Sequence, residues 1–233
     1  MVRYRFLRID ETMLRIFTLI IILFCAGWFL YSVRPKAGLL KNSLRIVISG
    51  AKDSLVKLTN PRSLRFTDAV VCVRLLSYFI AAVSALLLAF SGFIPYLISG
   101  GPLTGFMLML HVSVSPVFAV SMTAACLLWA HEHLFTKADT EWFIVHLFRR
   151  KERGGAHSYR TGRKICFWLL IILTPLITGS IILSLYPFFG TGSLNSLLTI
   201  HLMSALLFFA VGIVHAYLVL HSVKSESNKN NTS

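Results

Sequence analysis

Five long apolar runs constrain the fold of this chain more than any other feature of its sequence. A helix needs about 20 predominantly apolar residues to cross the hydrocarbon core of a bilayer. The chain is 56% hydrophobic and 14% charged, and it lacks the alternating segments of a membrane barrel. Because backbone groups in lipid must be satisfied within each segment, we predict an all-α integral membrane protein. Its spans are expected at residues 14–32, 73–98, 103–130, 166–187 and 196–221.

Lysine and arginine gather in two connections, 33–72 and 134–165, whereas the links 99–102 and 188–195 carry none. The positive-inside rule therefore predicts that both basic connections and the C-terminal tail are cytoplasmic and that the N-terminus lies outside. The net charge of +14 is thus explained by the cytoplasmic placement of these basic residues. We therefore expect membrane lipids, and no nucleic acid, as partners.

The chain is expected to divide into three parts. Residues 1–72 would be an uncleaved transmembrane anchor and a connection that rests on the membrane surface. Three arginines precede the first run, Arg3, Arg5 and Arg8, and they favour a cytoplasmic N-terminus. A peripheral or re-entrant anchor is therefore an alternative to a spanning one. Residues 73–221 would be a four-helix transmembrane bundle, and 222–233 a disordered polar tail.

Three histidines, His111, His201 and His215, lie inside apolar runs, where ionisable side chains usually mark a functional site. His111 and His201 are expected at similar depth in the non-cytoplasmic half of the membrane. His215 lies fourteen residues after His201, about four helical turns and about 21 Å along the same face. His131 and His133 fall near the cytoplasmic interface, and we expect both to be solvated or to face headgroups.

Imidazole is a usual axial ligand of haem iron, and a helical bundle can hold b-type haem between histidines on facing helices. A bound metal would therefore be haem iron on His111, His201 and His215. Zinc is less favoured, because no carboxylate or thiolate lies at the same depth. A lone membrane histidine often only bonds a neighbouring helix, and this alternative stays open for each residue.

Several collinear strings resemble the membrane cytochrome b (gamma) subunit of formate dehydrogenases and its relatives in thiosulfate reductases and nickel–iron hydrogenases. They are RFTDAVVCVRLLSY at 65–78, the helix and Asp-x-x-Trp turn within 108–143, the segment 158–187 that begins SYRTGRK, and His201-x13-His215. Together they cover about two-thirds of the chain.

The resemblance implies a four-helix bundle with two haems b in a prokaryotic inner membrane, within a hetero-oligomeric respiratory complex. It would carry electrons between menaquinone or ubiquinone and a periplasmic iron–sulfur or multihaem cytochrome c subunit. Substrate chemistry would belong to that partner, so the chain itself would be an electron-transfer subunit. His111 and His201 would bind the outer haem, and His215 would bind the inner one.

The sequence departs from the family pattern at two places. Ser77 stands where the family usually has the second ligand of the inner haem, so the chain could bind either one haem or two. Arg160 stands where an asparagine usually helps to bind quinone, and we name Arg160 and His215 as quinone-binding candidates. A haem-free membrane anchor is the main alternative function, and a channel or transporter is the least favoured.

Overall fold

The computed structural model describes residues 11–33, 49, 56, 66–100, 103–148, 156–186 and 190–230. Secondary structure in this part of the chain is helical throughout, with no strand. The elements are α1 (Glu11–Val33), α3 (Phe66–Ser99), α4 (Gly105–Trp129), η2 (Ala130–His133), α5 (Lys137–Phe148), α6 (Ala156–Ser184) and α7 (Thr191–Asn230). Within the described ranges, five helices (α1, α3, α4 with η2, α6 and α7) are long and apolar enough to cross a membrane. The prediction of an all-α, multi-pass chain is therefore confirmed.

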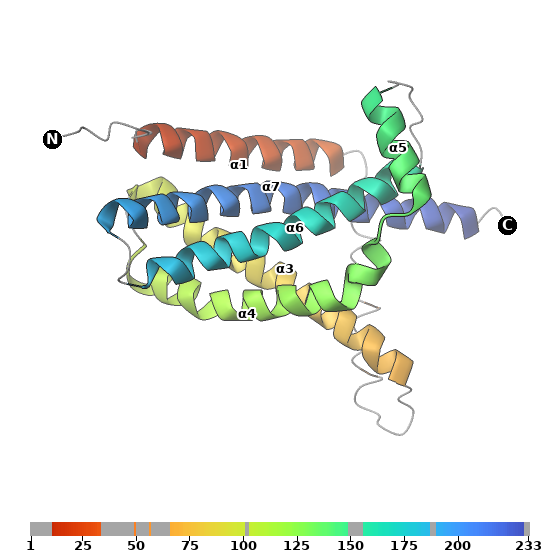
Figure 1. Ribbon diagram of the computed structural model, residues 1–233, viewed down its shortest axis with the longest axis horizontal. Helices are drawn as coiled ribbons and strands as arrows, with labels where there is room; N and C mark the ends of the chain where they lie inside the picture. The colour runs from red at the N-terminus through yellow and green to blue at the C-terminus, as the bar shows by residue number, and fades with distance from the viewer. Residues whose placement is uncertain are drawn as a thin grey trace.

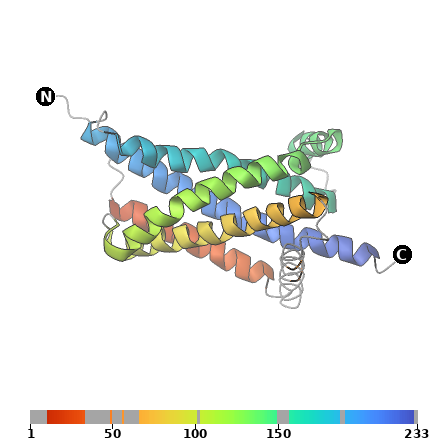
Figure 2. The same cartoon turned by 90° about the horizontal axis from the view of Figure 1, so that it is seen from below.

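Two helical hairpins and one added helix make up the bundle (Figures 1 and 2). Helix α3 packs closely on α4, and α6 packs closely on α7, whereas contacts between the two hairpins are sparse and run mainly from α4 to α6. Helix α1 lies along α7 and touches α3. We call the end with η2, α5 and the first turns of α3 and α6 the inner end. The end where α3 and α6 finish is the outer end.

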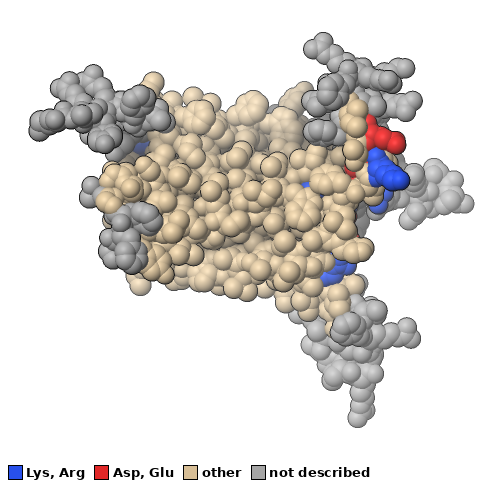
Figure 3. All heavy atoms as spheres, viewed as in Figure 1, with Lys and Arg blue, Asp and Glu red and all other residues tan. Residues whose placement is uncertain are grey.

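The flank of the bundle is apolar, and its few visible charges gather mainly at the inner end (Figure 3). Large side chains such as Phe24, Ile98 and Leu127 are more than two-thirds exposed. Buried positions, by contrast, hold many serines and threonines, and the hydroxyls of Ser84 and Ser204 donate to carbonyls of their own helices. Exposed apolar and buried small polar side chains are typical of helices that pack in lipid.

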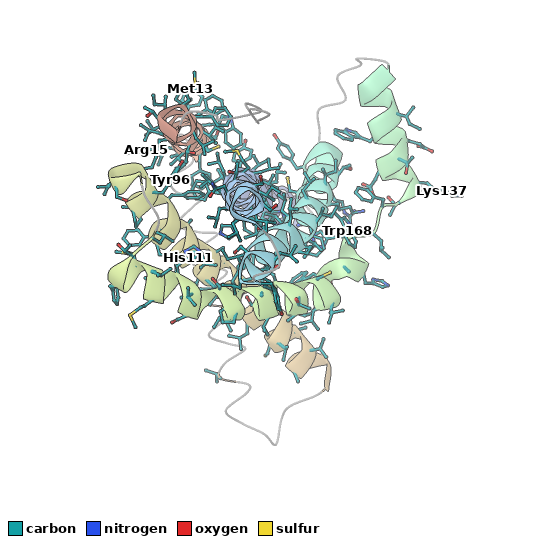
Figure 4. The ribbon with its side chains drawn as sticks, turned by 60° about the vertical axis from the view of Figure 1, so that its left-hand side comes forward. Met13, Arg15, Tyr96, His111, Lys137 and Trp168 are labelled. Atoms are coloured by element: carbon teal, nitrogen blue, oxygen red, sulfur yellow. The ribbon has the colours of Figure 1, made fainter. Side chains whose placement is uncertain are left out.

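Helix α1 is fixed to the outer end by Arg15, beside Tyr96 (Figure 4). The Nη2 of Arg15 donates to the carbonyls of Leu97 (2.6 Å) and Ile98 (3.3 Å) at the end of α3, where helix carbonyls lack partners of their own. The start of α1 therefore lies at the same end as the link that follows α3. This agrees with the predicted topology and favours a spanning anchor.

Helices extend beyond the expected spans in three places. Helix α3 begins at Phe66, before the span expected from residue 73. The basic connection 134–165 contains the helix α5 and the first turns of α6. Helix α7 continues to Asn230 through most of the tail expected to be disordered, because each residue added to an existing helix gains a hydrogen bond. The surface segment expected within 33–72 lies largely outside the described residues.

Candidate functional site

A cleft runs between the two hairpins, where their packing is sparse, and it extends to α1, which lines it with Thr12, Leu14 and Phe29. Its volume is about 2690 Å³, several times the roughly 300–1,000 Å³ of an ordinary ligand pocket. Small residues on α3 and α7 widen it, among them Ala81, Ala85, Gly92, Ala205 and Gly212. Gly179 of α6 is not part of its lining. His111, His201 and His215 all line this cleft.

The structure brings His111 of α4 and His201 of α7 together, as the sequence predicted. Their ring centres are 6.3 Å apart and their planes are inclined by 71°. Figure 4 shows His111 among the side chains that face the interior of the bundle. Two imidazoles bound to one metal, with metal–nitrogen bonds of about 2 Å each, would have ring centres roughly 6 Å apart. The pair therefore has the spacing that a shared metal requires.

Hydrogen bonds hold both rings by their Nδ1 atoms. The Nδ1 of His201 lies 3.0 Å from the carbonyl of Ile177, which can only accept, so this nitrogen carries the proton and Nε2 keeps the lone pair that binds metals. The Nδ1 of His111 lies 3.0 Å from the hydroxyl oxygen of Ser91, which also lies 3.3 Å from the carbonyl of Leu88. When this hydroxyl donates its one hydrogen to Leu88, His111 donates from Nδ1 and its Nε2 has the free lone pair as well.

Gly92 makes room for one of these rings. A Cβ atom at this position would lie 3.2 Å from Cε1 of His111, closer than an ordinary van der Waals contact. The glycine therefore allows the imidazole to lie against α3. Two imidazoles, a glycine and an apolar cleft together fit a haem held between α4 and α7.

Apolar side chains line the cleft between this pair and its inner end. Phe118 of α4 and Phe208 of α7 pack edge to face, with ring centres 5.4 Å apart. Ala81 and Met122 belong to the same buried cluster. All four side chains line the cleft between the two levels at which its histidines lie.

His215 is 5% exposed and lies near the inner end of the cleft. Its ring centre is 6.3 Å from that of Tyr78 on α3. Ser77, the residue before Tyr78, donates to the carbonyl of Arg74 in its own helix. In the described part of the chain, His215 therefore has no facing histidine on α3.

His133 is buried, whereas the sequence predicts that it is solvated or faces headgroups. It is 7% exposed, because it stacks on Phe167 with ring centres 4.0 Å apart. Its Nδ1 donates to the carbonyl of Trp129. His131, its neighbour in η2, is exposed as expected.

A buried ion pair joins α5 to α6 at the inner end. Lys164 Nζ lies 2.5 Å from the carboxylate of Asp139, and both side chains are nearly inaccessible. Thr136 and Thr161 donate to the same carboxylate. Burial raises the pKa of Asp139, but these hydrogen bonds outweigh it and hold the pKa well below its ordinary value. The pair thus connects the Asp-x-x-Trp turn to the segment that begins SYRTGRK.

Arg160, named as a quinone-binding candidate, is exposed on α6. Arg160 does not line the cleft that His215 lines. Arg160 and His215 are therefore not shown to share one site.

Comparisons of this chain with protein-family models, with curated proteins and with solved structures find no match.

Sequence reasoning missed the roles of Ser91, His133 and the Asp139–Lys164 pair. Nothing in the sequence distinguishes Ser91 from the other serines of the helices, and only its contact with His111 identifies it. Asp139 carried a usable signal, since Thr136 and Asp139 have the spacing of a residue pair that caps a helix N-terminus. Among the described residues, no group of three or more His, Cys, Asp or Glu side chains lies close enough to share a metal ion.

Proposed function

We propose that this chain is a membrane cytochrome b subunit that transfers electrons between the quinone pool and a periplasmic iron–sulfur or cytochrome c partner. His111 and His201 would hold one haem b in the outer half of the bundle. The observation that carries the proposal is the 6.3 Å spacing of these two rings, together with the hydrogen bond that each ring makes through its Nδ1.

When bound, haem iron with two imidazole ligands carries one electron at a time and has no position open to substrate. The chain's own part is to orient both rings and to surround them with apolar side chains. Burial and hydrogen bonds to the ligands are what a protein uses to set a redox potential. The resemblance of the sequence strings to the cytochrome b family is what brings the partner subunit, the quinone and the prokaryotic inner membrane into the proposal.

Haem content per chain tests the proposal. We expect at least one haem b per purified chain in a pyridine haemochrome assay. His111→Ala and His201→Ala should each remove the same haem. His131→Ala is the matched control, because this histidine is exposed on η2, and its haem content should equal that of the wild type. A folded wild-type chain without a Soret band would contradict the proposal.

A haem-free anchor subunit is the second candidate, and Ser77 is the observation that favours it. Its hydroxyl bonds within its own helix at the position where the resembling family has a ligand. Under this alternative the bundle would only tether a partner, and the two alanine variants would leave the absorption spectrum unchanged.

A further inference from the structure

Arg15 of α1 is a cation that forms no ion pair with an acidic side chain in the part of the chain that the structure describes. It lies within the span Thr12–Ser32, where a charged side chain is costly and usually has a function. Its Nη2 donates to the carbonyls of Leu97 and Ile98 at the end of α3. A helix C-terminus carries only about half of an elementary negative charge, so α3 compensates this cation in part.

The guanidinium of Arg15 has donors left over for a ligand. Arginine carries N–H groups on three nitrogens, and the two carbonyls use only those of Nη2. Nε is enclosed and has no hydrogen-bond partner within the described ranges. Nη1 makes no hydrogen bond to a described residue either, but it is not among the enclosed atoms. Nη1 can therefore bond a ligand at the outer end of the bundle.

Gly100 allows the guanidinium to lie across the end of α3. Its φ of +67° is in the left-handed region, which residues with a side chain rarely adopt. A Cβ at this position would lie 2.5 Å from Nη1 of Arg15, which is too close for two atoms that are not bonded. Glycine thus ends α3 and leaves space for the charge. The cation is therefore held in the contact between α1 and α3 and does not extend freely into its surroundings.

An apolar part of the cleft begins beside this charge. Thr12, one turn before Arg15, lines the cleft, and so does Gly100, which the guanidinium covers. The lining continues with Phe93 of α3 and Phe209 of α7, whose ring centres are 5.8 Å apart. Helix α1 touches α3 at few places, so an acyl chain can enter between them. A fixed cation at the rim of an apolar groove matches the phosphate and the acyl chain of a phospholipid.

We propose that Arg15 binds the phosphate of an anionic phospholipid at the outer end, with an acyl chain of this lipid in the groove between α1 and α3. A phosphate oxygen accepts a charge-assisted hydrogen bond from Nη1. Charge complementarity selects this occupant, because an uncharged lipid would leave the cation compensated only in part, and a soluble anion would leave the groove uncovered. The inference goes beyond the proposed electron-transfer function and does not depend on haem.

The test places the chain in phosphatidylcholine vesicles that contain a small share of a nitroxide-labelled lipid, either phosphatidylglycerol or phosphatidylcholine. A fluorophore on Leu103→Cys, in a variant without the four native cysteines, reports lipid at the outer end of the cleft, because Leu103 lines it. Labelled phosphatidylglycerol should quench this fluorophore with about fivefold higher affinity than labelled phosphatidylcholine, which is the usual effect of one basic residue near a lipid surface. Arg15→Gln should abolish this preference, and Arg15→Lys should retain most of it.

A second fluorophore position, Lys137→Cys at the inner end, is the matched control. Basic residues other than Arg15 attract anionic lipid there, so the preference for phosphatidylglycerol should be the same with Arg15, Arg15→Gln and Arg15→Lys. Quenching of the outer fluorophore by labelled phosphatidylcholine should also be equal in the three proteins, which shows that the outer end keeps its packing. Excess inorganic phosphate should leave the preference at residue 103 unchanged.

Equal affinity of the two labelled lipids at residue 103, with Arg15 in place, would overturn the inference. It would mean that the charge is satisfied within the chain, for example by Glu11, four residues earlier in the sequence. An undiminished preference in Arg15→Gln, or a complete loss in Arg15→Lys, would overturn it as well. Displacement of phosphatidylglycerol by inorganic phosphate would assign the site to a free anion and also contradict it.

Discussion

Gly92 of α3 lies directly against the imidazole of His111 on α4, because a Cβ at residue 92 would be 3.2 Å from Cε1 of that ring. The contact explains how a bulky ring lies close to a neighbouring helix. It also connects a residue without any side-chain chemistry to the proposed ligand pair, since the position of His111 relative to His201 depends on it.

Gly92→Val should therefore displace His111 and weaken haem binding. Overpacking of this kind costs about 1–3 kcal/mol, so the rate of haem loss to a scavenging apoprotein should rise about tenfold or more. Gly179→Val is the matched control, because no atom lies within 4 Å of a Cβ at residue 179. Similar rates in both variants would show that Gly92 does not position His111.

Removal of one partner of the buried ion pair should destabilise the inner end. Lys164→Met leaves the Asp139 carboxylate buried without its cation, which costs about 3–5 kcal/mol. The double variant Asp139→Asn/Lys164→Met removes both charges and should lose less. Thermal unfolding in detergent measures both, and a double variant less stable than Lys164→Met would contradict this account of the pair.

Asp139 should also make stability depend on pH. Its pKa is depressed in the folded chain, so its contribution is fully present above the ordinary pKa of about 3.9 and is lost as the pH falls below that value. The melting temperature of the wild type should therefore approach that of Asp139→Asn/Lys164→Met between about pH 5 and pH 3. A difference that stays constant over this range would show that the carboxylate remains insensitive to protonation there.

The hydrogen bonds of Arg15 hold the start of α1 at the end of α3, so both should lie on the same side of the membrane. Single cysteines at Thr12 and Leu103, placed in a variant without the four native cysteines, should react with a membrane-impermeant thiol reagent from the same side. A cysteine at Lys137 should react from the opposite side. Labelling of the cysteines at 12 and 137 from one side would contradict the spanning arrangement of α1.

Hydropathy predicted the helices well, and the similar depth of His111 and His201 within their apolar runs predicted that the two could face each other. These signals are local, since apolar length and helix periodicity depend only on neighbouring residues. The burial of His133 could not be predicted in this way, because it depends on Phe167 of another helix. The Asp139–Lys164 pair likewise joins two helices across a connection that sequence reasoning treated as a basic loop.

The most direct test of the central claim is electron paramagnetic resonance of the oxidised, purified chain, compared with His201→Ala. Two imidazole ligands on one iron should give a low-spin signal in the wild type. Loss of His201 should convert that signal to high spin or remove it together with the haem, whereas His131→Ala should leave it unchanged. A low-spin signal that persists unaltered in both His111→Ala and His201→Ala would contradict the account.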